Sequence, residues 1–188
     1  MSCYRRPGEV WTIYELDPLM ERIAKNPALF RSFSACAPST PVILGDARLT
    51  LKDAARGIDL LVLDAFTSDS VPVHLLTREA FALYRSKLSA HGVVVFHISN
   101  RNLELAGVVA ASAAANGMPV AVHRSRGAIS AETTPPEVVV AAQSRRDLTA
   151  LKLGAEWESV RTPPGFRTWT DDYSNILGVL LERLAGRN

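Results

Sequence analysis

The sequence predicts an α/β protein with a doubly wound, mostly parallel sheet that ends in an antiparallel strand pair. Short apolar runs of strand length alternate with amphipathic helical segments through the first two thirds of the chain, as in parallel sheets covered by helices. Two β-branched runs between residues 119 and 142 are then joined by a segment rich in helix breakers, which leaves no room for a crossover helix. A chain of 188 residues is long enough for one domain with a substantial core.

The first strand and helix are predicted at residues 10–17 and from Pro18 onward. The segment VWTIYELD is β-branched and aromatic, and apolar residues at helical spacing follow it. Asp17 suits the N-cap of that helix and Pro18 its first turn, where the missing N–H costs nothing. A second strand is predicted at residues 41–47.

Residues 58–64 (IDLLVLD) carry the strongest signal in the chain. The run is too short to span a membrane and is typical of a strand buried on both faces of a parallel sheet. Ligand sites in open α/β sheets lie beyond the carboxyl ends of the strands, so Asp64 is the first candidate for a catalytic residue. The helix predicted after it places on one face Leu76, Ala80, Leu83, Tyr84 and Leu88.

The remaining elements complete a methyltransferase-like (Rossmann-like) order, in which the last two strands form a hairpin at one edge. They are a strand at 92–99, a helix at 103–116 capped by Gly117, strands at 119–125 and 137–142, a helix at 145–153 and an amphipathic segment at 175–184. Such sheets begin with a strand and a glycine-rich turn, which we do not find upstream of Val10. We therefore interpret residues 1–188 as a single domain that lacks this first strand and glycine loop.

Carboxylates follow the first two predicted strands. Glu15 has the position at which nucleoside-binding folds hold a ribose diol, because one carboxylate can accept two parallel hydrogen bonds. Asp17 is either a second contact or simply the helix cap. Asp46 could accept a hydrogen bond from an exocyclic amine, with Gly45 allowing a close backbone approach, and a plain turn is the alternative.

Further polar candidates follow the later strands. Asp69 comes soon after Asp64, and two carboxylates could bind an amine cation and take its proton, although a turn before Pro72 explains Asp69 as well. His97 is either a core histidine or a residue of the site. Asp172 and Tyr173 belong to a polar and aromatic stretch that could be a lid over the cleft or a helix-capping segment.

Composition excludes several classes of function. The net charge is +2 and the basic residues are scattered, so no nucleic-acid footprint is visible. Cys3 and Cys36 lack zinc-ligand spacing and are expected to be reduced, and no histidine–carboxylate spacing suggests a metal site. No leader sequence and no apolar run of ~18 residues is found, so we expect a cytoplasmic chain without a membrane segment.

Five motifs, taken in order, resemble the spermidine synthase (polyamine aminopropyltransferase) family. They are YELDP (14–18), GDAR (45–48), LDAFTSDSVPVHLLTREAF (63–81), HISNR (97–101) and TDDYSN (170–175). The resemblance runs from about residue 4 to residue 181 and is strongest to a bacterial branch often fused to a transporter-like membrane half. It implies the methyltransferase-like fold and a single N-terminally truncated catalytic domain.

The resemblance also implies a reaction and a set of site residues. Family members transfer an aminopropyl group from decarboxylated S-adenosylmethionine to putrescine, release methylthioadenosine and need no metal. Carried over by motif, Glu15 holds the ribose hydroxyls, Asp46 with Ala47 faces the adenine, and Asp64 deprotonates or positions the attacking amine. We further assign Asp17 to the cofactor side, Asp69 to catalysis and the substrate side, and to the substrate side also His97, Asp172 and Tyr173.

The chain departs from the family pattern in three ways. Asp69 follows Asp64 at a spacing of five residues where the family has three, residues 70–74 (SVPVH) replace a Pro-Gly continuation, and the glycine loop with the small N-terminal strand domain is not found. Two alternatives therefore stay open: a non-catalytic nucleoside-binding remnant or regulatory domain, and an S-adenosylmethionine-dependent methyltransferase. The amine acceptor is undecided, as is the choice between a monomer and a homodimer.

Overall fold

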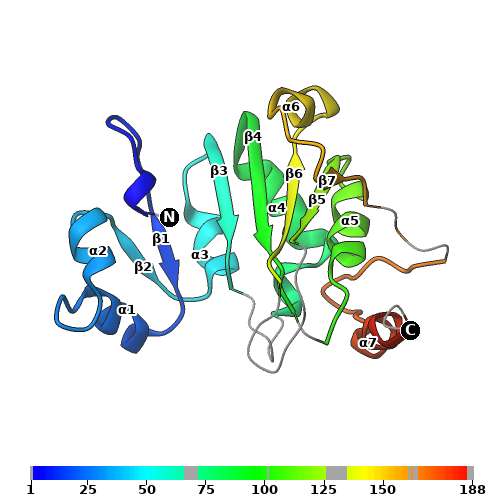
Figure 1. The fold of residues 1–188 in the computed structure, drawn as a ribbon, viewed down its shortest axis with the longest axis horizontal. Helices are drawn as coiled ribbons and strands as arrows, with labels where there is room; N and C mark the ends of the chain where they lie inside the picture. Colours follow the sequence, from blue (N-terminus) through cyan, green and yellow to red (C-terminus); the bar gives the residue numbers. More distant parts are fainter. Residues whose placement is uncertain are drawn as a thin grey trace. The chain divides into compact units, whose positions relative to one another are not determined.

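The computed structural model describes residues 2–65, 72–100, 102–125, 135–160, 162 and 165–185. The chain divides into two compact units, Met1–Ala54 and Ala55–Asn188 (Figure 1). No helix among the described residues is long and apolar enough to cross a membrane, since the longest have ten residues. Asp69 and the residues that flank it lie outside the described part of the chain.

The first unit is built on a parallel pair of short strands. Its elements are η1 (Ser2–Tyr4), β1 (Ile13–Glu15), α1 (Pro18–Lys25), α2 (Arg31–Cys36), β2 (Val42–Leu44) and α3 (Ala47–Asp53). The register pairs Ile13 with Val42 and Glu15 with Leu44, so both strands end at the same edge. The predicted strands at 10–17 and 41–47 are confirmed in their centres and are shorter than predicted, and α2 and α3 were not predicted.

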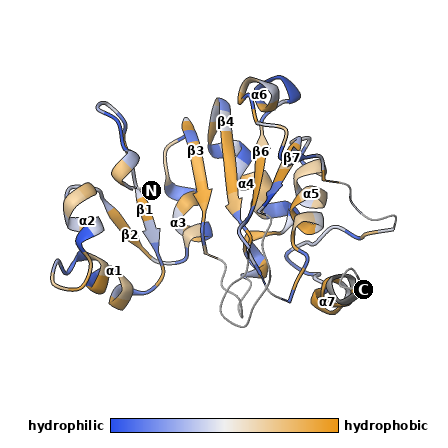
Figure 2. Ribbon diagram, in the orientation of Figure 1, coloured by the Kyte–Doolittle hydropathy of each residue, from blue (hydrophilic) through white to orange (hydrophobic). Residues whose placement is uncertain are grey.

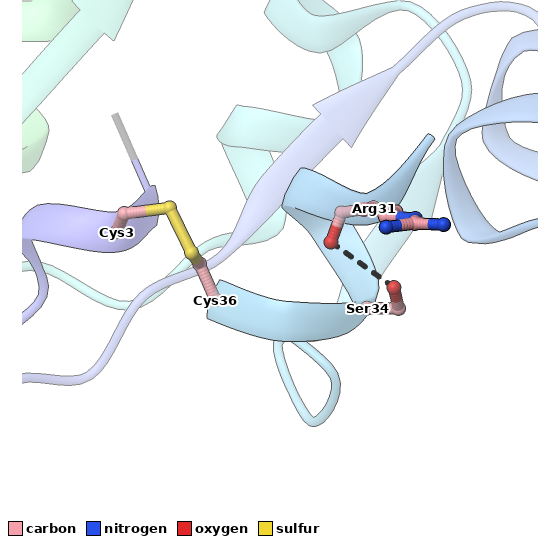
Figure 3. The surroundings of a disulfide bond; sticks show 4 residues. All are labelled: Cys3, Arg31, Ser34 and Cys36. Carbon is pink, nitrogen blue, oxygen red and sulfur yellow. Dashed lines mark hydrogen bonds between the residues drawn. A yellow bond between two sulfur atoms is a disulfide. The ribbon is translucent and has the colours of Figure 1, made fainter. Parts of the chain in front are cut away.

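A disulfide joins Cys3 in η1 to Cys36 at the end of α2, with a Cα–Cα distance of 4.6 Å (Figure 3). The prediction of two reduced cysteines is therefore wrong. The two residues are 33 positions apart and lie in elements that sequence periodicity does not relate to one another. Because disulfides persist mainly in oxidising compartments, the cysteines do not support a cytoplasmic location, which stays a prediction.

The second unit contains a five-stranded sheet in the order β3-β4-β6-β5-β7. Its strands are β3 (Ile58–Leu63), β4 (Leu88–His97), β5 (Val120–Arg124), β6 (Glu137–Ala142) and β7 (Trp157–Glu158). β3 and β4 are parallel, whereas the β4–β6, β6–β5 and β5–β7 pairs are antiparallel. The predicted α/β architecture with an antiparallel pair near the C-terminus is confirmed, and β7 is an addition that the sequence did not reveal.

The helices of this unit are η2 (Val73–Leu75), α4 (Arg78–Lys87), α5 (Ala106–Ala114), α6 (Arg145–Ala150) and α7 (Ile176–Ala185). Of these, α4 contacts β4, α5 contacts β5 and β6, and α6 contacts β6. The rings of Phe81 and Phe96 stack with centroids 5.0 Å apart, and Tyr84 tilts against both, which fastens α4 to β4. Of the face predicted for this helix, Ala80 and Tyr84 are buried in α4 and Leu83 is partly buried. Leu76 and Leu88 are buried too, but Leu76 precedes α4 and Leu88 is the first residue of β4, so the helix is shorter than predicted. Figure 2 shows that β3, β4 and β6 also consist largely of hydrophobic residues.

The prediction that residues 58–63 are buried on both faces is wrong for the first half of β3. Leu60 is 51% exposed, and burial is reached only at Leu63. In the sheet as described, β3 is an edge strand that pairs with β4 alone. An edge strand has a neighbouring strand on one side only, whereas a central strand such as β4 has one on each side. An apolar run therefore does not by itself establish burial.

Reduction of the disulfide should destabilise the first unit. A bond that closes a loop of this length removes conformations from the unfolded chain, and we expect Cys36→Ser or a reducing agent to lower the free energy of unfolding of this unit by about 2–4 kcal/mol. Urea unfolding followed by far-UV circular dichroism, with and without reductant, measures the change. The Cys36→Ser protein should no longer respond to reductant, and an oxidised wild type with unchanged stability on reduction would contradict the prediction.

Candidate active site

The register of β3 against β4 brings Asp64 next to His97. Leu63 is paired with Phe96, so the next residue of each strand, Asp64 and His97, meets at the same carboxyl edge. The Nδ1 atom of His97 lies 2.7 Å from Oδ1 of Asp64. The side chains are 40% and 67% exposed respectively, which excludes the interpretation of His97 as a core histidine.

Ser99 extends this pair toward the interior of the sheet. Its Oγ lies 2.8 Å from Nε2 of His97 and accepts a hydrogen bond of 2.8 Å from the backbone N–H of Glu137 in β6. His97 and Ser99 are two residues apart in an extended segment, so their side chains point to the same side. Three side chains therefore form a continuous row from the exposed end of β3 to the backbone of β6.

Asn100 has a structural role in the turn that follows. Its side chain is buried at 2% exposure, and its Oδ1 accepts hydrogen bonds of 2.9 Å from the N–H groups of Asn102 and Leu103. This local bonding holds the turn between β4 and α5.

The segment around Asp171 is docked on the first turn of α4. Thr77, the N-cap of that helix, donates its hydroxyl to Oδ1 of Asp171 at 2.7 Å, and the Asp171 N–H donates to Glu79 at 3.1 Å. Helix α4 lies in the connection between the parallel strands β3 and β4, so its N-terminus lies toward the end at which β3 stops. The contact thus ties residues near the C-terminus to the edge of the sheet that carries Asp64.

Asp172 and Tyr173 follow directly in this docked segment. Asp172 is exposed, and Tyr173 forms backbone hydrogen bonds with Thr170 in both directions, at 2.8 and 3.1 Å. The guanidinium of Arg167 lies 3.8 Å from the centroid of the Tyr173 ring. Asn175 caps the start of α7 by accepting from the N–H of Gly178, so the segment does include a helix cap, and its role as a lid stays a prediction.

The candidate cofactor residues gather beyond the carboxyl ends of β1 and β2. Glu15 accepts a hydrogen bond of 2.9 Å from the N–H of Asp17, and Asp17 in turn accepts from the N–H of Leu19 at 2.7 Å as the N-cap of α1. Asp46 caps α3 by accepting from the N–H of Leu49 at 3.0 Å, and Ala47 is the first residue of that helix. Each carboxylate thus has a local structural partner, and the nucleoside contacts assigned to them stay predictions.

Sequence reasoning missed one part of the site. Ser99 follows His97 at the strand end, and the His-x-Ser spacing puts both side chains on one face. The pairing of Thr77 with Asp171 spans 94 residues and leaves no local signal. The assignments of Glu15 to the cofactor and of Asp64 and Asp69 to catalysis stay predictions.

Comparisons with known proteins find similarity in sequence and in fold. No family model matches the chain. Over 92 residues, which are 47% of this chain and 29% of the relative, the sequence is 36% identical to a polyamine aminopropyltransferase of Vibrio vulnificus (strain CMCP6). A probable spermidine synthase from Corynebacterium glutamicum ATCC 13032 has a similar fold with a TM-score of 0.62 at 17% identity, covering 87% of this chain and 64% of that chain. The spermidine synthase of Thermotoga maritima has a TM-score of 0.55 at 10% identity, covering 92% and 56%.

The chain is thus similar in sequence to a polyamine aminopropyltransferase and in fold to spermidine synthases. A further spermidine synthase, solved in complex with the transition state analogue AdoDATO, matches with a TM-score of 0.50 at 12% identity and covers 92% of this chain. The chain spans less than two thirds of the length of each of these relatives. The predicted methyltransferase-like fold is thereby confirmed.

The docking of the Asp171 segment should depend on pH through Glu79. Partial burial raises the pKa of the Glu79 carboxyl, but hydrogen bonds from its own backbone N–H, from Arg78 and from the Asp171 N–H outweigh it and leave that pKa below its ordinary value. A lowered pKa means that the contact is fully present above the ordinary carboxyl pKa and is lost as the pH falls through the lowered one.

The amide resonance of Asp171 should report this change in a titration followed by ¹H–¹⁵N NMR. We expect a midpoint below that of an ordinary glutamate, and its disappearance in Glu79→Gln. Glu158→Gln, which changes a carboxylate elsewhere in the unit, should leave the titration intact. If the Asp171 amide shows the wild-type titration in Glu79→Gln as well, Glu79 does not hold the segment.

Proposed function

We propose that the protein transfers an aminopropyl group from decarboxylated S-adenosylmethionine to a diamine such as putrescine, with methylthioadenosine as the second product. The observation that carries the proposal is Asp64, a largely exposed carboxylate at the carboxyl end of a parallel strand, with one oxygen held by His97. The names of the related proteins support the same reaction.

The chemistry needs a base at this place. An ammonium group has no lone pair, so the diamine nitrogen must be neutral when it attacks the methylene carbon next to the sulfonium. A nitrogen–carbon bond then forms while the carbon–sulfur bond breaks, and its electron pair returns to sulfur, which leaves as a neutral thioether. The proton lost by the amine passes to the Asp64 carboxylate, and no oxidant, reductant or metal is consumed.

The proposed cofactor side uses the residues beyond β1 and β2. Glu15 would hold the ribose diol with its carboxylate, and Asp46 with Ala47 would contact the adenine, while Asp17 supports the turn between them. The parallel register, which ends both strands at one edge, supports this grouping. The substrate side would add Asp69, His97, Asp172 and Tyr173 around Asp64, where acidic groups suit a diamine that is cationic in solution.

Replacement of Asp64 by Asn should remove the base and preserve the shape of the site. In the complete protein that carries this chain, we expect Asp64→Asn to lower turnover by roughly 10²–10⁴-fold. Methylthioadenosine affinity, measured by calorimetry, should stay nearly unchanged. Unchanged aminopropyl transfer in this variant would show that Asp64 is only structural.

Two controls make this test specific. Asp59→Asn changes another exposed carboxylate of β3, bonded to Ser89 at 2.7 Å near the start of the strand, and should leave turnover intact. Parallel assays with S-adenosylmethionine and with its decarboxylated form, analysed by mass spectrometry, separate the reactions. A methylated amine, or no product from either donor, would refute the proposed aminopropyl transfer.

Glu15→Gln should weaken cofactor binding more than it affects chemistry. Loss of charge-assisted hydrogen bonds to a diol is expected to raise the methylthioadenosine dissociation constant by about 10- to 100-fold, because each such bond contributes about 1.5–3 kcal/mol. Glu21→Gln in α1, whose carboxylate pairs with Lys25, is the matched control and should bind normally. Equal affinities for wild type and Glu15→Gln would remove Glu15 from the cofactor site.

A further inference from the structure

We infer that His97 is a positioning residue that holds the Asp64 carboxylate in one orientation, and that Ser99 fixes the tautomer in which His97 does so. The row Asp64–His97–Ser99 ends on the backbone N–H of Glu137, so the catalytic carboxylate is anchored to β6 through two side chains. The kinetic consequence rests on the proposed function, whereas the arrangement of protons in the row does not.

The partners determine which atom carries the imidazole proton. An ionised carboxylate can only accept hydrogen bonds, so the neutral form of His97 donates Nδ1–H to Asp64. Its Nε2 is then an acceptor, and the Ser99 hydroxyl must donate to it. This direction is compatible with the Glu137 N–H, which donates to a lone pair of the same hydroxyl oxygen.

The backbone pairing of β4 with β6, and not the hydrogen bonds between its three side chains, holds the row in place. The backbone N–H of Ile98 donates to the carbonyl of Glu137 at 2.9 Å, so the residues on both sides of it are fixed to β6. His97 itself is paired with Val138 in the antiparallel ladder. A histidine–carboxylate contact this exposed adds little stability, and its main effect is therefore to restrict the orientation of Asp64.

The gradient of exposure shows which end of the row is available to a substrate. Hydrolase triads built from the same residue types bury the aspartate and present the serine. Here the order is reversed, because the Asp64 side chain is 67% exposed, His97 is 40% exposed and Ser99 is partly buried against β6. With Oδ1 bonded to His97, Oδ2 is the oxygen that takes the amine proton.

His97 does not carry that proton away. Its Nδ1 already bears a hydrogen directed at Asp64, so it has no lone pair with which to accept a second one there. The imidazole therefore acts on the reaction through the Asp64 carboxylate.

The chain offers a matched control at the other end of the same strand. His91 in β4 contacts Asp147 in α6, also at 2.7 Å between Nδ1 and Oδ1. In Figure 1 the arrowheads of β3 and β4 point away from α6, which lies near the opposite end of these strands. His91→Ala thus removes a histidine–aspartate contact of the same length outside the proposed site.

The first test measures the protons directly. Imidazole ¹⁵N shifts of the ligand-free protein at mildly alkaline pH should show His97 as the Nδ1–H tautomer, and Ser99→Ala should shift its Nε2 signal. An Nε2–H tautomer for His97, or a spectrum that does not respond to Ser99→Ala, would overturn the inference whether or not the protein transfers aminopropyl groups.

The second test is kinetic. We expect His97→Ala to lower kcat by about 10- to 100-fold with little change in the KM for the cofactor, because misplacing a catalytic group costs turnover. His97→Asn, whose amide can still donate to Asp64, should recover part of that loss, and His91→Ala should leave kcat unchanged. An unaltered kcat in His97→Ala, or covalent labelling of Ser99 by a fluorophosphonate, would overturn the inference. If neither donor gives a product while the tautomer is as stated, the proposed function fails and the arrangement of protons in the row stands. If Asp64→Asn is fully active, Asp64 is not the base and the positioning role of His97 fails with it.

Discussion

The parallel pairing of β3 with β4 in a single register is the constraint on which the candidate site depends. Side chains alternate across a strand, so Phe96 enters the core against Phe81 while its neighbour His97 faces the other way, toward Asp64. A slip of one residue would turn His97 into the core and expose Phe96. The stacking of the rings and the burial of Val94 and Phe96 therefore select the register that assembles the polar row.

The residues of β4 that form the core and those that form polar contacts lie in different parts of the strand. Its central residues are buried between β3 and β6, and burial of this kind supplies most of the favourable free energy of folding. Its histidine contacts lie outside this centre, at His91 in the first half of the strand and at His97, its last residue. Both histidine side chains are exposed, so their hydrogen bonds can be rearranged at small cost in stability.

The carboxylates of the first unit combine two demands. Asp17 and Asp46 each cap a helix that starts just beyond a strand, and such caps stabilise a helix by about 0.5–2 kcal/mol. The strand-to-helix turn needs an acceptor at that position whether or not a ligand binds. The nucleoside contacts that we propose for these residues would be a second demand on the same side chains.

The approximate positions of most strands and helices, and the strand-end location of Asp64, were determined by the sequence alone, because the spacing of apolar residues and the capping groups act within a few residues. Only the tertiary structure decided that β3 is an edge strand with Leu60 exposed, that Cys3 is bonded to Cys36, and that Thr77 holds Asp171. It also decided that His97 faces Asp64. These features depend on which distant segments become neighbours, and that choice is made by the packing of the whole sheet, which no local pattern encodes.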